Sequence, residues 1–219
     1  MHQQRIPLFP LGVVLLPRMP LPLHIFEERY REMIARCREE DLVFGVVYAV
    51  GAKLQTHGCT ARVERVLETY EDGRSDILTL GENRFRIDQI HEDRPYLEAD
   101  VSYFDDEPAD GYGTNGASER IRELAATAID RLETLGNLSG REIDRKPLES
   151  LDPRSLSFMV GASGVFTLED RQGLLETRST EERLREEVER LENSIARREM
   201  IRRARRTLGL KGDLSHFLN

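Results

Sequence analysis

Residues 7–33, PLFPLGVVLLPRMPLPLHIFEERYREM, decide the fold of the first half of the chain. The stretch places five prolines and a run of branched aliphatic residues directly before a charged, amphipathic segment. Pro17, Pro20 and Pro22 have no amide hydrogen to donate, so we expect an extended crossing here rather than a central strand. A helix is expected to follow it. The apolar stripe of that helix comprises Phe26, Tyr30, Met33, Ile34 and Cys37.

The remaining residues up to about 104 are patterned like β-strands. Residues 42–50, LVFGVVYAV, form the near-continuous apolar run of a strand that is buried on both faces. In residues 96–104, YLEADVSYF, apolar and polar side chains alternate, which predicts a strand with one face inward and one in water. Between these two stretches, Asp72-Gly73 separates two further strand-like segments and predicts a tight hairpin.

The pattern changes in the second half of the chain. Residues 105–118, DDEPADGYGTNGAS, contain almost no aliphatic side chains and predict a linker. We therefore expect a barrel domain over 1–104, a linker over 105–117 and a helical domain over 118–219.

Helical periodicity runs through this second half. The first predicted helix carries Ile121, Leu124, Ala125, Ala128, Ile129, Leu132 and Leu135 and ends at Gly136-Asn137. Asp152 and Pro153 have the positions of an N-cap and a first helical residue. A short helix is expected within 167–177, and Ser179 with Glu182 has capping-box spacing ahead of a long last helix.

Composition and charge exclude several classes of protein. The chain has 219 residues, 39% of them hydrophobic and 33% charged, which is typical of a globular protein with its own core. Its net charge of −8 disfavours a general nucleic-acid binder. Because no basic leader and no apolar run of about 18 residues is visible, we expect a cytoplasmic protein without a membrane segment. Cys37 and Cys59 are expected to be reduced core thiols.

No motif of a known chemistry stands out. The sequence has no P-loop, no G-x-S-x-G and no H-E-x-x-H, and its five histidines are scattered singly. The acidic cluster Asp105, Asp106, Glu107 and Asp110 lacks the layout of a calcium loop and is expected to be a solvated linker. The arginine run at 197–206 complements the dipole of the last helix, with nucleic-acid binding as the less favoured interpretation. We therefore expect no catalytic residue, metal or cofactor.

Residues 6–34, IPLFPLGVVLLPRMPLPLHIFEERYREMI, resemble the start of the Lon protease N-terminal domain family. Further family-like segments follow in order: GCTARVERV, DGRSDILTLGENRFRI, YLEADVSYFDDE and FTLEDRQGLLETRSTEERL. The resemblance implies an α+β fold, a PUA-like mixed β-barrel with one covering helix, followed by a C-terminal helical bundle. Without recognisable ATPase or protease domains, the chain looks like a stand-alone member.

The resemblance also implies a function, because this region of Lon proteases engages unfolded or tagged substrates. We expect a non-catalytic polypeptide-binding module, an adaptor or holdase, whose partners include such polypeptides and a separate protease or chaperone. An open strand edge and a groove between barrel and bundle are the expected binding features. The candidate peptide-binding residues are Leu21, Leu23 and Phe26, with ordinary core positions as the alternative. An RNA-binding PUA-like protein and a peptidase without a recognisable motif stay open.

Overall fold

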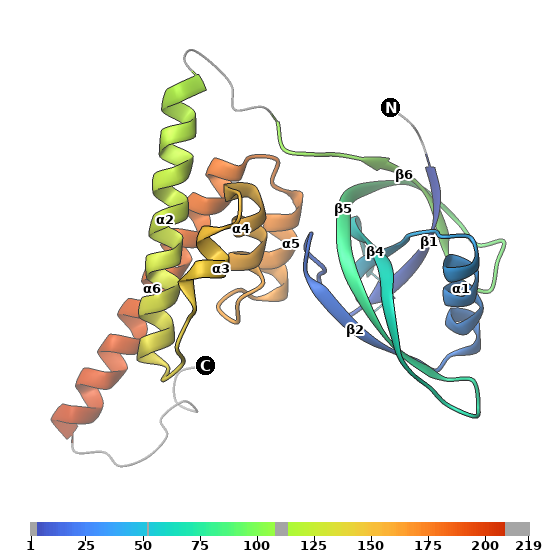
Figure 1. Ribbon diagram of the computed structural model, residues 1–219, viewed down its shortest axis with the longest axis horizontal. Coiled ribbons are helices and arrows are strands. Elements are labelled where there is room, and N and C mark those ends of the chain that lie inside the picture. Colours follow the sequence, from blue (N-terminus) through green and yellow to red (C-terminus); the bar gives the residue numbers. More distant parts are fainter. Residues whose placement is uncertain (1–3, 52, 108–113, 209–219) are drawn as a thin grey trace.

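Hydrogen-bonded strands that close on themselves form the first half of the protein. A computed structural model describes residues 4–51, 53–107 and 114–208 (Figure 1). Its strands are β1 (Gln4–Leu11), β2 (Pro20–Ile25), β3 (Phe44–Val50), β4 (Lys53–Thr69), β5 (Ser75–His91) and β6 (Glu98–Tyr103). The sheet order is β2-β5-β4-β3-β1-β6, and an additional pairing of β5 with β6 closes five of the strands into a barrel. Of the strand pairs in the described residues, β1 with β3 is parallel and the others are antiparallel, so the predicted mixed barrel is confirmed.

The long hairpin of β4 and β5 is the largest element of the barrel. Its turn has the predicted position, and Gly73, with a φ of 82°, adopts the left-handed conformation that glycine tolerates. Three register shifts bend the two strands along their length. As a result, β5 reaches three partners: β2 over residues 75–80, β4 over residues 75–86 and β6 over residues 85–91.

The proline-rich stretch before the first helix is extended, as the sequence predicts, but it is also paired. Residues of β2 align with β5 from Pro20 opposite Leu80 to Ile25 opposite Ser75. Among the strands that the structure describes, β2 has no partner on its other side, so it is an edge strand, where proline is tolerated.

Helix α1 (Glu28–Glu39) covers the barrel core (Figure 1). Four of the five residues of the predicted stripe are buried on it: Tyr30, Met33, Ile34 and Cys37. The fifth assignment is wrong, because the helix begins at Glu28 and Phe26 precedes its extended N-cap, Glu27. The Phe26 side chain is 60% exposed.

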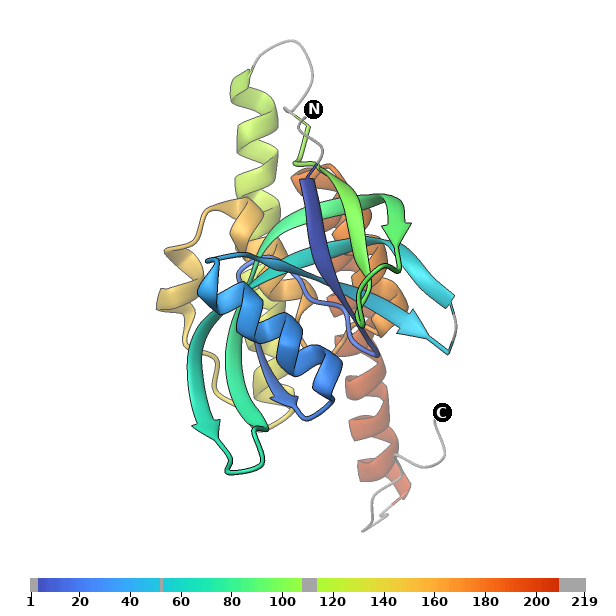
Figure 2. The same ribbon diagram turned by 90° about the vertical axis from the view of Figure 1, so that its right-hand side faces the viewer.

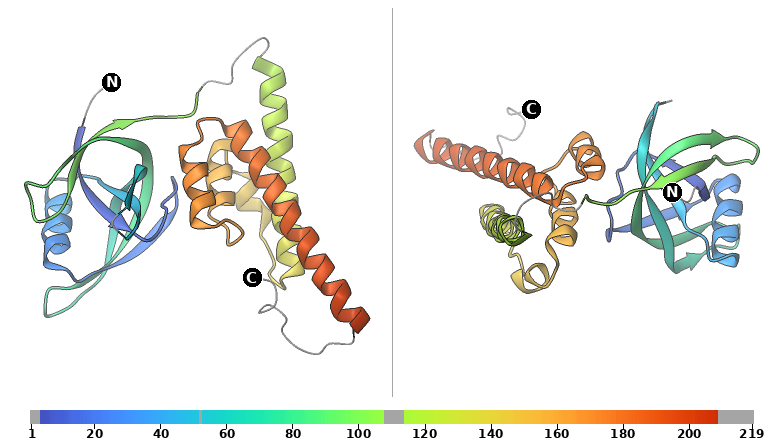
Figure 3. Two further views of the ribbon diagram at one scale, coloured as in Figure 1. Left: turned by 180° about the vertical axis from the view of Figure 1, so that it is seen from behind. Right: turned by 90° about the horizontal axis from the view of Figure 1, so that it is seen from above.

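A helical bundle follows the barrel. It comprises α2 (Thr114–Leu138), α3 (Arg145–Glu149), α4 (Pro153–Gly161), α5 (Leu168–Glu176) and α6 (Thr180–Leu208). The two long helices, α2 and α6, lie side by side in the views of Figures 1 and 3. The predicted caps are present, since the Asp152 carboxylate accepts a hydrogen bond from the Ser155 amide at 3.0 Å and the Ser179 hydroxyl accepts one from the Glu182 amide at 3.2 Å.

The bundle differs from the prediction at three places. α2 begins at Thr114, before the expected residue 118, and continues through Gly136-Asn137 to Leu138. The short helix α3, which Asp144 caps, was not predicted. The sequence also gave no sign that one apolar cluster would be shared between the two halves: Phe158 of α4 and Leu175 of α5 belong to the same buried cluster as the barrel residues.

Candidate functional site

A buried ionic cluster joins the barrel to the bundle. Arg84 of β5 and Arg183 of α6 have fully buried side chains, and both donate to the carboxylate of Asp106, at 2.5 Å and 2.6 Å. Arg84 also donates to the carbonyl oxygens of Leu175 and Thr177, at 3.1 Å and 2.6 Å. Both guanidinium groups face the ring of Phe158. The cluster therefore fixes α5 and the start of α6 against the outside of the barrel.

Asp106 is ionised in this cluster. Burial opposes the charged form, but hydrogen bonds from Arg183 and Thr180 and the charges of both arginines outweigh it and lower the pKa of Asp106 to about 2. The prediction of a solvated linker is therefore wrong for Asp106, whose side chain is only 11% exposed. Asp105 and Glu107 are exposed and pair with Arg154 and Arg178, whereas Asp110 lies outside the described residues.

The three candidate peptide-binding residues do not form one surface. Leu21 and Leu23 point inward and pack, half-buried, against the barrel core. Phe26 lies beyond the end of β2 and is exposed. Leu21 and Leu23 thus occupy core positions, which was the alternative interpretation. Of the three candidates, Phe26 alone is exposed to a partner.

The outer face of β2, β5 and β4 exposes apolar side chains. Residues directly opposite each other on antiparallel strands share a face, so Pro20 lies beside Leu80, and Pro22 beside Leu78. Neither leucine belongs to a core cluster, and both are half-buried. Leu67, the extra residue at a register shift of β4, is 48% exposed. With Phe26, these residues form what we call the hairpin face: Pro20, Pro22, Phe26, Leu67, Leu78 and Leu80.

Three aromatic residues, His24, Phe26 and Tyr70, lie together at the end of the hairpin face that is nearest the β4–β5 turn. The rings of Phe26 and His24 stack at 5.9 Å, and His24 meets the edge of the Tyr70 ring at the same distance. The Asp76 carboxylate holds this group together, because it contacts His24 Nδ1 at 2.5 Å and accepts from the Tyr70 hydroxyl at 2.7 Å. The bond to Asp76 raises the pKa of Tyr70 to about 12. The Phe26 ring therefore stacks on His24, which Asp76 holds in place, and does not pack into the core.

The free edge of β2 offers few hydrogen-bond donors. The Gly81 amide donates to the Met19 carbonyl, so the backbone groups of residues 21, 23 and 25 face β5 and those of Pro20, Pro22 and His24 face outward. Two of these three outward positions are prolines, which have no amide hydrogen. Addition of a peptide strand at this edge is therefore disfavoured.

A second surface lies where β4 and β5 separate. The ladder between them ends at His57 opposite Arg86, although β4 begins at Lys53 and β5 continues to His91. Beyond that pair, β5 is aligned only with β6. Figure 2 shows the β3–β4 hairpin projecting away from the end of β5. We call this opening, between residues 53–56 and 87–91, the seam.

Apolar side chains line the seam. Ile90 is 42% exposed, and Leu54 and Ile87 are only half-buried against the second barrel cluster. The seam closes at Phe85, whose ring packs on the backbone of β4: a Cβ atom added to Gly58 would lie 2.6 Å from it. Gly58 therefore allows β4 and β5 to meet above the seam.

A pocket of about 320 Å³ lies at the closed end of the seam, next to the junction with the bundle. His57 and Arg86, the last paired residues of β4 and β5, both line it. The other lining residues are Ser102, Tyr103, Phe104, Asp105, Glu176 and Arg178. The expected groove between barrel and bundle thus corresponds to a small pocket in which an aromatic ring, Phe104, stands among charged groups.

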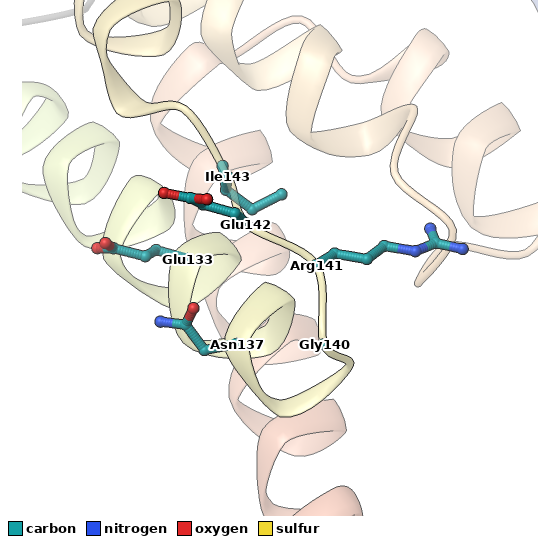
Figure 4. Close-up of a pocket in the computed structure, with 6 residues that line it drawn as sticks. All are labelled: Glu133, Asn137, Gly140, Arg141, Glu142 and Ile143. Atoms are coloured by element: carbon teal, nitrogen blue, oxygen red, sulfur yellow. The ribbon is translucent and has the colours of Figure 1, made fainter.

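A second pocket of about 320 Å³ lies at the far end of the bundle, between α2 and the segment that follows it (Figure 4). Glu133 and Glu142 point to one side of this segment and Arg141 to the other. Glu133 is paired with Arg145 at 2.6 Å. The polar lining makes this pocket a poor match for an apolar side chain.

The described side chains carry no evident reaction centre. The thiols of Cys37 and Cys59 are free and buried, and burial raises the pKa of Cys37 to about 11 and that of Cys59 further. His57 Nδ1 lies 3.1 Å from the exposed Thr56 hydroxyl and 3.7 Å from the Glu176 carboxylate. His24 and His91 pair with carboxylates of Asp76 and Asp100, and in the described residues no hydroxyl or thiol bonds to either ring. In the same residues no three candidate ligands gather around a possible metal position, and no helix combines the length and hydropathy of a membrane span.

Comparisons with known proteins agree with this architecture. Two solved structures share the fold: the Lon N-terminal domain protein from Xanthomonas campestris, with a TM-score of 0.61 and 22% identity, and the N-terminal domain of a Mycobacterium avium complex Lon protease, with 0.66 and 19%. The first match covers 84% of this chain and 96% of that chain, and the second 86% and 98%.

Curated relatives are longer proteins. Lon protease 2 of Myxococcus xanthus is 25% identical over 97% of this chain but only 26% of its own length, and the Lon protease of Flavobacterium johnsoniae is 24% identical over 81% and 22%. The chain thus spans about a quarter of the relatives it matches. The family described as the ATP-dependent protease La (LON) substrate-binding domain matches residues 5–193, and the chain belongs to that family.

Proposed function

We propose that this protein binds unfolded polypeptides through the hairpin face and catalyses no reaction on them. The observation that carries the proposal is the set of apolar side chains that no helix of the bundle covers, above all Phe26 and Leu67. Large exposed apolar side chains that gather on neighbouring strands favour an interaction site, here bordered by Arg62 and Arg65 opposite Leu80 and Leu78. The family supports a substrate-binding role for the matched region.

Such binding would serve an adaptor or a holdase. An unfolded segment presents apolar side chains that a folded protein hides, and the hairpin face offers them a complementary surface without a deep pocket. A separate protease or chaperone would then receive the bound chain. In this proposal, any cleavage or refolding of the bound chain is carried out by that partner.

The test measures binding of reduced, carboxymethylated α-lactalbumin, a permanently unfolded protein, by fluorescence anisotropy. We expect a Kd of tens of micromolar, roughly −6 to −7 kcal/mol. The double variant Phe26→Ser, Leu67→Ser should weaken binding about tenfold or more, because both side chains lose their apolar contact with the probe. The wild type should also suppress aggregation of a heated model protein, which the double variant should do poorly.

Met200→Ser is the matched control, since Met200 is 61% exposed but lies on α6. It should bind the probe like the wild type. Absence of binding by the wild type at 100 µM, or equal binding by the double variant, contradicts the proposal.

RNA binding is the alternative that the arginine-rich end of α6 favours, because residues 197–206 contain six arginines. Arginines of this run are already engaged within the protein: Arg198 donates to Ser139 and Arg203 pairs with Glu199. Retention on immobilised RNA that falls steeply with salt would support this alternative.

A further inference from the structure

We propose that a pocket in the helical bundle binds a carboxylate that is joined to an apolar group. The pocket has a volume of about 560 Å³, which lies in the range of small-molecule sites. It shares Arg141 and Ile143 with the polar pocket of Figure 4 and extends from them to the turn at 163–165 and to Arg198 of α6. The inference is independent of the proposed function, because the hairpin face takes no part in it.

Two glycines shape one wall of this pocket. Gly140, with a φ of 71°, takes the left-handed conformation that glycine tolerates, and residues 141–143 then run back beside α2 (Figure 4). Gly136 of α2 lets that segment approach closely, since a Cβ atom added there would lie 2.6 Å from Ile143 Cγ1 and 2.8 Å from the carbonyl oxygen of Arg141. The position of Arg141 beside the pocket is therefore set by the fold.

The floor of the pocket is apolar. Leu135 belongs to the buried cluster of the bundle, and three half-buried residues that line the pocket pack against the same cluster: Leu132, Ile143 and Val165. A hydrocarbon group placed here would cover aliphatic surface that the bundle leaves in contact with water. Such burial is favourable.

Two guanidinium groups line the same pocket, and none of its described lining residues is acidic. Figure 4 shows Arg141 pointing away from Glu133 and Glu142. In the part of the chain that the structure describes, no carboxylate pairs with Arg141 or Arg198, whereas Arg145, close by, pairs with three. The pocket is thus a site of uncompensated positive charge in a chain whose net charge is −8.

Neither guanidinium is needed to cap α2. The last carbonyl oxygens of that helix already accept other hydrogen bonds: Leu135 from the Ser139 hydroxyl at 2.7 Å, and Gly136 from the Arg141 amide at 2.9 Å. The Ser139 hydroxyl also accepts from Arg198 at 2.9 Å, which holds this guanidinium beside α2. Its other N–H groups remain for a ligand, because a guanidinium carries five donors.

Charge and apolar surface together select the ligand. Guanidinium groups bind carboxylates and phosphates through paired hydrogen bonds. The aliphatic floor favours a carboxylate on a hydrocarbon group over a bare phosphate, since it would strip water from the phosphate without offering it a hydrogen bond. Two sources present this chemistry: a small organic acid, and the last residue of a polypeptide when its side chain is apolar.

The experiment titrates four probes into the full chain and follows backbone amides and arginine Nε–H groups by NMR: octanoate, N-acetylleucine, N-acetylleucine amide and inorganic phosphate. We expect at least one of the two carboxylates to bind with a Kd below about 1 mM and to shift the signals of Ser139, Ile143 and Val165. The uncharged amide and phosphate should bind at least about tenfold more weakly. Preference for octanoate indicates a small acid as the source, and preference for N-acetylleucine indicates a polypeptide end.

Arg141→Gln and Arg198→Gln should each weaken carboxylate binding about fivefold to tenfold, because each removes one charge-assisted donor. Arg202→Gln is the matched control, since it removes the same charge one turn further along α6, at an exposed position outside the pocket lining. It should bind like the wild type. The double variant Phe26→Ser, Leu67→Ser should also bind like the wild type, which separates this site from the hairpin face.

Four outcomes overturn the inference: no binding of either carboxylate at about 10 mM, equal binding of the amide or of phosphate, undiminished binding in both arginine variants, or shifts confined to the hairpin face. None of them affects the proposed function, which the unfolded probe tests separately.

Discussion

The barrel has two contrasting outer surfaces: the side that the bundle covers, and the hairpin face. On the covered side, two arginines are fully buried around one aspartate. On the hairpin face, Phe26 and Leu67 are 60% and 48% exposed. This reverses the usual distribution, in which arginines are exposed and large apolar residues are buried.

The contrast teaches that burial in this protein depends on available hydrogen-bond partners as well as on hydrophobicity. A buried guanidinium is tolerated only where carboxylate and carbonyl oxygens receive its hydrogen bonds, and Arg84 has three such acceptors from two separate segments. The hairpin face stays uncovered although its side chains would be stabilised by burial. The predictions below change one surface at a time.

Removing the shared carboxylate should have the largest effect. We expect Asp106→Asn to lower the free energy of unfolding by about 3–5 kcal/mol, because two buried guanidinium groups lose their counter-charge. Denaturant unfolding at pH 7 measures it. Asp105→Asn, at an exposed position of the same segment, is the control and should cost much less.

The same carboxylate predicts a loss of stability in acid. Its folded-state pKa of about 2 lies below the ordinary value, so its contribution is complete above about pH 4 and is lost as the pH falls toward 2. Asp106→Asn should remove this part of the pH dependence. A wild-type and a variant profile that run parallel between pH 4 and 2 would show that Asp106 is not ionised in the fold.

Glu187 of α6, also on the covered side, is a buried carboxyl group whose pKa is raised, whereas that of Asp106 is lowered. It is fully buried next to Gly161, neither carboxyl oxygen has a hydrogen-bond partner in the described part of the chain, and burial raises its pKa well above the ordinary value. We expect Glu187→Met to stabilise the protein by about 1–3 kcal/mol at pH 8, since it removes an unsatisfied buried group.

The pH dependence of that gain has a definite sign. A raised pKa means that the wild type loses stability as the pH rises above the ordinary value of a glutamate, so the advantage of Glu187→Met should grow from pH 5 to pH 8. Thermal unfolding at both pH values tests it. A gain that is constant with pH would mean that Glu187 titrates normally.

The smallest stability effect is expected on the hairpin face. Phe26→Ser and Leu67→Ser should each change the free energy of unfolding by no more than about 0.5 kcal/mol, because the bundle does not cover them. A loss of several kcal/mol in either variant would show that these side chains are structural, and it would remove the contrast between the two surfaces.

Local signals predicted much of the fold. The hairpin turn at Gly73, the caps at Asp152 and Ser179 and the buried stripe of α1 depend on residues close in sequence. Phe26 was placed on that stripe because its spacing fits a helix, but periodicity alone did not indicate that the helix begins two residues later. The resemblance to the Lon family supplied the barrel, which no local pattern indicates.

The junction and the seam could not be predicted, because both depend on residues far apart in the chain. Arg84, Asp106 and Arg183 carry no pattern that separates them from the other charged residues, and the composition around Asp106 is that of a linker. The seam depends on where the ladder between β4 and β5 ends, which register shifts decide. Proline spacing in β2 does indicate a blocked edge, and this signal is visible in the sequence alone.

The position of Arg84 affects how the chain can be divided. A fragment that stops at residue 104, where the composition suggests a boundary, would keep this guanidinium but lose Asp106 and both carbonyl acceptors. The same holds on the ribosome, where β5 emerges long before Thr177. Arg84 therefore acquires its last hydrogen-bond acceptor only after most of the polypeptide has been made, and a useful truncation has to retain α5 and the Thr177 that follows it.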